Sequence, residues 1–251
     1  MSDQLRATLA DAGRVLAMEG HGDYVAGHIS VRLPGDPGRF LMKPAGIGIE
    51  EMRPDNIITV DIEGDKVAGT MPRHNEVFIH SEVLRARSDV RCVIHSHPMH
   101  AVAFSSLGKP LVAVGNSSVH FTDGRLPVFS ETTDLIINQE RGKAVARCLG
   151  DNAALILRNH GIVATGGSIE EAVWTAIKLE RACQLQLLAE SAGGPKLVAE
   201  GEDLSKKRRR GSRPDQHNNT FGYLLRRWRC LCCGEIVPAP RVTAFENKDQ
   251  S

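Results

Sequence analysis

Four side chains in this sequence have the chemistry of metal ligands: Glu76, His95, His97 and His160. His95 and His97 follow a short apolar stretch that predicts a strand, and side chains two apart on a strand point to the same face. Both imidazoles can therefore converge on one ion. Glu76 lies in the first turn of a predicted helix, and His160 lies in a tight connection between two predicted strands. Three imidazoles and one carboxylate suit a four-coordinate site for a divalent metal.

The elements that must position these side chains alternate between helix and strand. Apolar residues at helical spacing predict helices from Leu5 to Met18, Glu76 to Ala86, Met99 to Ser105, Thr133 to Leu149, and Ser168 to about Ser191. The last of these begins with Ser168-Ile169-Glu170-Glu171, a capping-box pattern. Hairpins and short strands are expected at Ile29–Leu33 with Phe40–Met42, Asn56–Asp61 with Lys66–Ala68, Cys92–Ile94, Val112–Val114, Leu126–Phe129, Ala154–Leu157 and Ile162–Thr165. This order indicates an α/β layered fold with a largely antiparallel sheet.

Composition limits the domain organisation and the partners. At 251 residues and 41% hydrophobic content, one main domain is expected over residues 1–195. Residues 196–251 are expected to be a basic linker and a partly disordered C-terminal segment, in which Phe221–Trp228 forms a helix that docks back. The formal charge of +1 favours neither nucleic acid nor a membrane surface as partner. No signal peptide or spanning segment is recognised, so a cytoplasmic protein is expected.

Five ordered motifs carry a resemblance to a known family. They are Gly27-His28-Ile29-Ser30, Lys43-Pro44-Ala45-Gly46, Asn75-Glu76 followed by His80, His95-Ser96-His97-Pro98 and Asn159-His160-Gly161. Their order and spacing resemble the class II aldolase/adducin family over residues 5–190. The resemblance implies a three-layer αβα sandwich and a homotetramer with sites at subunit interfaces. It also implies one divalent ion per chain at the four ligands named above, with zinc expected and iron or manganese as alternatives.

The same resemblance suggests the substrate-binding residues, and here the sequence departs from the phosphosugar enzymes of the family. Their small neutral phosphate-binding set is replaced by His28, Ala45 and His74 with Asn75. Cationic or flat donors suit a planar carboxylate at least as well as a phosphate, so we expect an unphosphorylated small-molecule carboxylate. The expected substrate-binding residues are His28, Ser30, Lys43, Gly46, Arg73, His74 and Asn75, and the expected catalytic residues are Glu76, His28 and Tyr223.

The Gly-His-x-Ser and Lys-Pro-x-Gly variants look like the branch that contains decarboxylases of dihydroxylated aromatic acids such as 3,4-dihydroxyphthalate. We therefore expect a metal-dependent carbon–carbon lyase of aromatic compound catabolism. Glu76 or a neighbouring histidine is expected to move the proton, with His100 and His120 as weaker candidates. The alternatives are an aldolase acting on an unphosphorylated hydroxy-keto acid, a non-haem iron oxygenase similar to the prenyl-hydroxybenzoate synthases, and an adducin-like interaction module without catalysis.

Overall fold

A single mixed sheet, with the strand order β4-β3-β2-β1-β5-β8-β7-β6, forms the centre of the protein. The computed structural model describes residues 2–196, 198–211 and 213–234. Neighbouring strands are antiparallel except for β6 and β7, which are parallel. The largely antiparallel sheet expected from the sequence is thus confirmed. The strands are β1 (His28–Leu33), β2 (Asp36–Met42), β3 (Ile58–Asp61), β4 (Lys66–Ala68), β5 (Cys92–Ser96), β6 (Val128–Phe129), β7 (Ala154–Leu157) and β8 (Gly161–Gly166).

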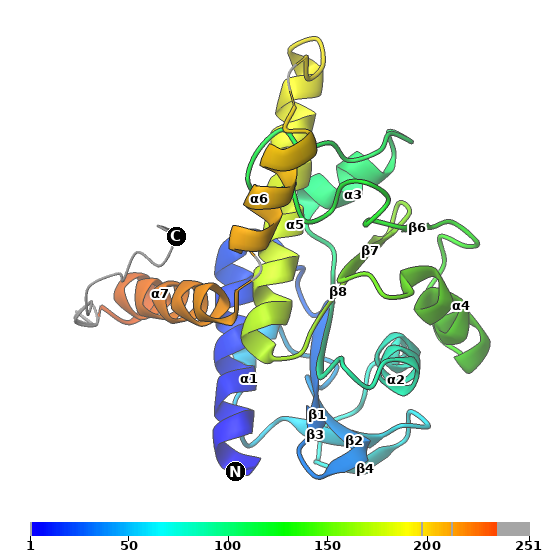
Figure 1. The fold of residues 1–251 in the computed structure, drawn as a ribbon. Helices are drawn as coiled ribbons and strands as arrows, with labels where there is room; N and C mark the ends of the chain where they lie inside the picture. The colour runs from blue at the N-terminus through cyan, green and yellow to red at the C-terminus, as the bar shows by residue number, and fades with distance from the viewer. Residues whose placement is uncertain (1, 197, 212, 235–251) are drawn as a thin grey trace.

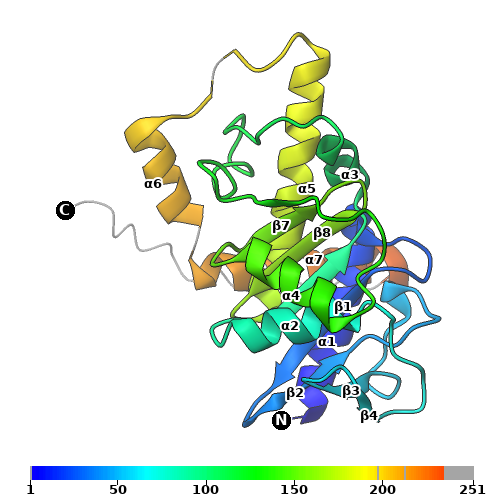
Figure 2. The same cartoon turned by 90° about the vertical axis from the view of Figure 1, so that its right-hand side faces the viewer.

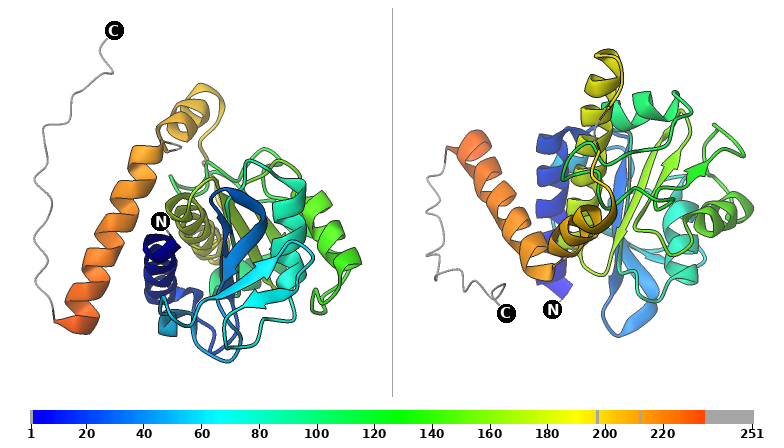
Figure 3. Two further views of the ribbon diagram at one scale, coloured as in Figure 1. Left: turned by 90° about the horizontal axis from the view of Figure 1, so that it is seen from below. Right: turned by 45° about the horizontal axis from the view of Figure 1, so that its top comes forward.

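Helices cover both faces of the sheet and complete the three layers (Figure 1). α1 and α5 cover one face, and α2 and α4 cover the other, which faces the viewer in Figure 2. α7 packs on the outer side of α1 and α5, as the view from below shows (Figure 3). The helices are α1 (Ser2–Leu16), α2 (Val77–Ala86), α3 (Met99–Ser105), α4 (Gln139–Leu149), α5 (Ile169–Ser191), α6 (Gly201–Gly211) and α7 (Pro214–Cys233).

Strand β5 shows how side-chain alternation sorts residues between the two apolar layers. Ile94 lies in the buried cluster formed with α1 and α5, whereas Val93 lies in the cluster formed with α2 and α4. Because side chains two apart share a face, His95 points to the same side as Val93, toward the start of α2. The strand that builds the core therefore also directs the first predicted ligand.

The prediction of a helix from Thr133 was wrong at its N-terminal end. α4 begins only at Gln139, because the Asn138 side chain accepts a hydrogen bond from the Arg141 N–H at 2.9 Å and caps the helix there. The strand expected at 112–114 was also wrong, since that segment is irregular. The predicted start of α5 is confirmed: Ser168 is its N-cap, although the Glu171 carboxylate accepts from the Gly167 N–H and not from Ser168.

The segment expected to be a solvated basic linker is largely helical, which corrects that part of the prediction. α6 contains the basic run, and its Arg208 donates hydrogen bonds to the Val119 carbonyl at 2.8 Å and to the Thr122 hydroxyl at 3.1 Å. The docking helix is confirmed and is longer than expected, with Phe221 and Leu224 buried against α1 and α5. Residues 235–251, where partial disorder was expected, lie outside the described residues, and the division at residue 195 stays a prediction.

A buried carboxylate joins α7 to the rest of the protein. Glu19, in the turn that follows α1, accepts hydrogen bonds from Arg181 of α5 at 2.6 Å and from Arg227 of α7 at 2.8 Å. Its side chain is only 6% exposed. Removal of this carboxylate would leave two neighbouring guanidinium groups to repel each other where α5 meets α7.

We therefore expect Glu19→Ala to loosen α7 selectively and to lower the free energy of unfolding by roughly 1–2 kcal/mol. Hydrogen exchange measured by mass spectrometry should become faster in 214–233 while the central strands keep their protection. Glu202→Ala is the matched control, since Glu202 forms an exposed pair with Lys206 within α6. Equal exchange in α7 of the two variants would contradict this role of Glu19.

Candidate metal centre

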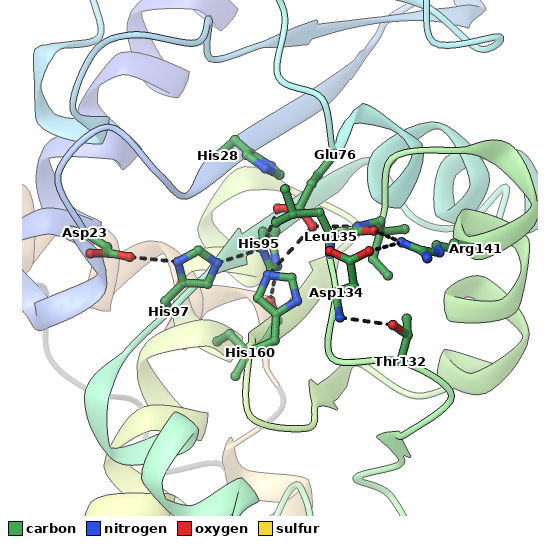
Figure 4. A network of polar contacts seen from close by, with 12 residues as sticks. Asp23, His28, Glu76, His95, His97, Thr132, Asp134, Leu135, Arg141 and His160 are labelled. Atoms are coloured by element: carbon green, nitrogen blue, oxygen red, sulfur yellow. Dashed lines mark hydrogen bonds and ion pairs between the residues drawn. The ribbon is translucent and has the colours of Figure 1, made fainter.

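The four predicted ligands converge in the folded chain. One ligand atom from each of Glu76, His95, His97 and His160 lies within 4.8 Å of the others. The Nε2 atoms of His95 and His97 are 3.0 Å apart, and Glu76 Oε2 lies 3.5 Å from His95 Nε2. His160 Nε2 lies 3.7 Å from Glu76 Oε1. Figure 4 shows the four side chains pointing toward one another.

Sheet register explains why residues so distant in sequence meet here. β5 pairs with β8, placing His95 opposite Val163. β8 also pairs with β7, so the turn that carries His160 lies beside the end of β5. Asn159 adopts a left-handed conformation in this turn (φ 55°), which asparagine tolerates better than most residues, and its N–H donates to Ser105 of α3 at 2.9 Å.

Hydrogen bonds on the outer ring nitrogens orient two of the histidines. His95 Nδ1 lies 3.0 Å from the Ile162 carbonyl oxygen, which can only accept, so Nδ1 carries the proton. His97 Nδ1 donates to Asp23 Oδ2 at 2.9 Å. When both rings are neutral, Nε2 of each presents a lone pair to the centre, and two lone pairs 3.0 Å apart beside a carboxylate suit a cation.

Glu76 and His160 have the protonation states that metal binding needs. Burial alone would raise the pKa of Glu76, but the nearby His95 and the hydrogen bond from the Ile136 N–H outweigh it and lower that pKa to about 2. Burial lowers the pKa of His160 to about 4, with His95 contributing in the same direction. His160 Nε2 is buried and has no hydrogen-bond partner among the described residues. An anionic carboxylate and a neutral imidazole with a vacant lone pair fit a divalent ion.

Glycine is required at position 161 by close packing at this centre. A Cβ on Gly161 would lie 2.5 Å from the Ser96 carbonyl oxygen and 2.7 Å from Cδ2 of His97. Both distances are far below van der Waals contact, so any side chain here would displace His97. The Asn-His-Gly motif thus supplies one ligand, His160. Its glycine leaves the space that a second ligand, His97, occupies.

A second group of histidines adjoins the ligands. His28 of β1 is paired with His95 across the strands, and their ring centroids are 5.0 Å apart. His28 Nδ1 lies 2.6 Å from His80 Nε2, and His80 Nδ1 lies 2.6 Å from the Ser30 hydroxyl. Burial, together with repulsion from neighbouring imidazoles, holds the pKa values of His28 and His80 well below the usual range. This wall of the centre therefore consists of neutral imidazoles.

Lys43 and His74 extend the same wall. Lys43 is fully buried, and burial lowers its pKa to about 8. Its Nζ lies 3.1 Å from the Val25 carbonyl oxygen, 3.3 Å from the Pro44 carbonyl oxygen and 3.1 Å from His74 Nε2. The two carbonyl oxygens accept from the ammonium group, whereas His74 Nε2 also lies 3.0 Å from the Pro44 carbonyl oxygen, which can only accept, so this nitrogen carries a proton. Direct contact of Lys43 with a substrate stays a prediction.

The remaining predicted residues lie at different distances from this centre. Gly46 and Asn75 are exposed, and Arg73 donates to the His74 carbonyl and lies over the Phe78 ring. Tyr223 is 56% exposed on α7, on the other side of the sheet from α2. The weaker candidates are engaged elsewhere: His100 pairs with Glu180 at 2.6 Å, and His120 packs edge-on against Trp174. Their roles in catalysis stay predictions.

Two contributors to the centre were missed from the sequence. Asp23 holds His97, and the Ile136 N–H holds Glu76 at 2.9 Å. A carboxylate or carbonyl partner is expected for any metal-binding histidine, but no pattern in the chain singles out Asp23. The Ile136 N–H is free to bond because 133–138 is irregular and does not continue α4.

The comparisons with known proteins agree with this geometry. The chain belongs to the family described as Class II Aldolase and Adducin N-terminal domain, whose model matches residues 7–187. No helix in the described part of the chain is both long and apolar enough to cross a membrane.

Individual relatives carry different activities in their names. 3,4-Dihydroxyphthalate decarboxylase of Arthrobacter keyseri is 32% identical over 201 residues, covering 75% of this chain and 80% of that protein. A 4-hydroxy-3-prenylphenylpyruvate oxygenase/4-hydroxy-3-prenylbenzoate synthase of Streptomyces roseochromogenus is also 32% identical, over 68% of this chain and 62% of that protein. Among solved structures, L-fuculose 1-phosphate aldolase from Glaciozyma antarctica aligns with a TM-score of 0.81 and 29% identity over 93% of this chain and 91% of that one.

The Asp23 contact predicts a measurable effect on metal affinity. Asp23→Asn keeps the shape of the side chain but removes the charge that orients His97, and we expect zinc affinity to fall about 10- to 100-fold. Competition with a chromophoric chelator would measure it. Asp36→Asn, at an acidic residue of the β1–β2 hairpin, is the control and should bind zinc like the parent protein. Unchanged affinity in Asp23→Asn would show that His97 is oriented without the carboxylate.

Buried His21 predicts how stability depends on pH. Burial lowers its pKa from 6.5 to about 4 in the folded chain, where Nδ1 lies 2.9 Å from the Ser96 hydroxyl. As pH falls from about 6.5 to about 4, the unfolded chain gains a proton that the folded chain refuses, so stability decreases across this window. Urea unfolding of chelator-treated protein should show the loss, and His21→Asn should reduce its slope. Parallel pH profiles for parent and variant would contradict this assignment.

Proposed function

We propose that this protein is a divalent-metal-dependent carbon–carbon lyase that decarboxylates a dihydroxylated aromatic acid such as 3,4-dihydroxyphthalate. The observation that carries the proposal is the juxtaposition of the ligand cluster with a wall of neutral imidazoles, where His28 lies 5.0 Å from the His95 ring. The identity to 3,4-dihydroxyphthalate decarboxylase over most of both chains supports this substrate class.

The reaction needs a place for the electron pair released when the carboxyl group leaves. A divalent ion held by Glu76, His95, His97 and His160 would act as a Lewis acid that stabilises negative charge on the catechol oxygens and ring. We assign zinc to this site, with iron or manganese as alternatives, because three imidazoles and one carboxylate suit all three ions.

The protein side chains would bind the acid and move the proton. His28 and His74 orient the substrate carboxylate by hydrogen bonding. Glu76, with a pKa of about 2, is a carboxylate in the free protein and so acts first as a base. Its Oε2, which does not accept the Ile136 N–H, takes the proton of a catechol hydroxyl as substrate binds. The same proton is transferred to the ring carbon as carbon dioxide leaves, and the phenolate left behind takes one proton from solvent when the product is released.

The proposal includes an oligomeric state, a cellular compartment and a class of partner. Tyr223 lies on α7, on the other side of the sheet from α2. We propose a homotetramer whose sites lie at subunit interfaces and receive Tyr223 from a neighbour. We propose a cytoplasmic enzyme of aromatic compound catabolism with a small-molecule carboxylate as its partner. Nucleic acid is not proposed as a partner, since Arg208 of the basic run already bonds within the chain.

Two other reactions remain as alternatives. The structural similarity to L-fuculose 1-phosphate aldolase favours an aldolase, here acting on an unphosphorylated hydroxy-keto acid. The relative named as an oxygenase is as similar in identity as the decarboxylase, but three histidines and a carboxylate leave fewer open positions than non-haem iron oxygenases usually have. An interaction module without catalysis would have no need to retain all four ligands.

The test is release of carbon dioxide from 3,4-dihydroxyphthalate and related catechol carboxylates by zinc-, manganese- and iron-loaded protein. We expect metal-dependent release that falls at least 100-fold on chelation and in His97→Ala and Glu76→Gln. Glu202→Gln is the matched control, because it makes the same carboxylate-to-amide change at an exposed site. No release from any of these acids by protein that binds one metal per chain would reject the decarboxylase and favour the aldolase.

A further inference from the structure

A fully buried histidine that binds neither metal nor solvent lies behind the site. His80 is on α2, on the face that packs against the sheet, and its neighbours on that face include Val77, Val83 and Leu84. An imidazole in such apolar surroundings is destabilising unless both ring nitrogens are bonded. His80 meets this condition through two short contacts, both with side chains of β1.

The two contacts form a series of hydrogen bonds that runs from Ser30 through His80 to His28, beside the metal centre. His80 Nδ1 lies 2.6 Å from the Ser30 hydroxyl, and His80 Nε2 lies 2.6 Å from His28 Nδ1. Ser30 and His28 are two residues apart on β1 and so share a face, which lets a single side chain of α2 bridge them. With Nδ1 of His28 engaged, Nε2 is its one ring nitrogen left to meet a substrate. Figure 4 shows the His28 ring directed toward Glu76 and His95.

Ser30 allows the direction of these hydrogen bonds to reverse, which an apolar residue could not do. A hydroxyl can either donate to His80 Nδ1 or accept from it. When Ser30 donates, His80 donates to His28 Nδ1, and His28 Nε2 then carries a proton. When Ser30 accepts, the order reverses, and His28 Nε2 presents a lone pair. Both arrangements keep the two rings neutral and keep His28 in one orientation.

We propose that His80, supported by the Ser30 hydroxyl, is a positioning residue that holds the His28 imidazole with Nε2 toward the substrate beside the metal ligands. The importance of this for catalysis rests on the proposed function, in which His28 orients the substrate carboxylate. The proposal also reassigns Ser30: it was expected to bind substrate, but its hydroxyl is buried and acts through His80.

The first test does not depend on activity. Crystal structures of zinc-loaded His80→Ala, His80→Gln and His80→Asn would show the His28 ring. A glutamine amide can reach the position of Nε2 and keep the bond to His28, whereas an asparagine amide reaches only toward Ser30. We expect the His28 ring to stay in place in His80→Gln and to rotate in His80→Asn and His80→Ala, with full zinc occupancy in all three. An unmoved His28 ring in His80→Asn overturns the proposal, even if His80→Ala fails to fold.

The second test separates positioning from a general structural role through a double-mutant cycle. With a substrate that the metal-loaded protein decarboxylates, we expect His80→Asn to lower kcat/KM at least 10-fold and His80→Gln to recover most of that loss. In a His28→Ala background, His80→Asn should change kcat/KM less than 2-fold. Equal losses in both backgrounds would show that His80 does not act through His28. If no substrate is found, the proposed function fails, and the crystal structures still decide the role of His80.

Discussion

The arrangement of the site depends on four ligand atoms that converge at short range on a position suited to a cation. The Nε2 atoms of His95 and His97 face each other at 3.0 Å, with the Glu76 carboxylate and the buried Nε2 of His160 close by. Such an arrangement persists in a folded chain only when its surroundings hold each ligand in place. The hydrogen bonds from the outer ring nitrogens of His95 and His97 provide that restraint, because they determine both orientation and protonation.

Several elements of the fold serve this restraint directly. β5 and β8 align His95 with the Ile162 carbonyl, and the β7–β8 turn carries His160. Glu180 of α5 accepts the backbone N–H groups of His100 and Ala101, so it anchors the start of α3, which follows His97 by two residues. The sheet thus aligns the ligands, and hydrogen bonds to neighbouring elements hold the segments at its edge.

Burial keeps the histidines beside the metal ligands neutral. His28, His74 and His80 all have pKa values far below the usual range, and the first cause in each case is burial. Neutral imidazoles beside a cation can donate or accept hydrogen bonds without adding charge that would repel the metal. Under the proposed function, a planar acid would be oriented here while a bound metal and Lys43 supply the positive charge.

Much of the fold and the ligand set follows from local sequence patterns. Alternation along Cys92–Ser96 predicts that His95 and His97 share a face, Ser168 marks the start of α5, and Gly161 is compatible with a tight turn. Five ordered motifs sufficed to recognise the family. These features could be predicted because each depends on residues that are near in sequence, or on the order of the five motifs along the chain.

The parts that the sequence left open depend on contacts between distant residues. The Ile136 N–H donates to Glu76 across 60 positions. Asp23 reaches His97 across 74 positions, and His80 reaches Ser30 across 50. The sequence by itself determined which side chains could bind a metal and which strands and helices would carry them. Only the tertiary structure decided which partners orient those side chains, because hydrogen-bond partners are selected by proximity after packing and leave no periodic signal in the chain.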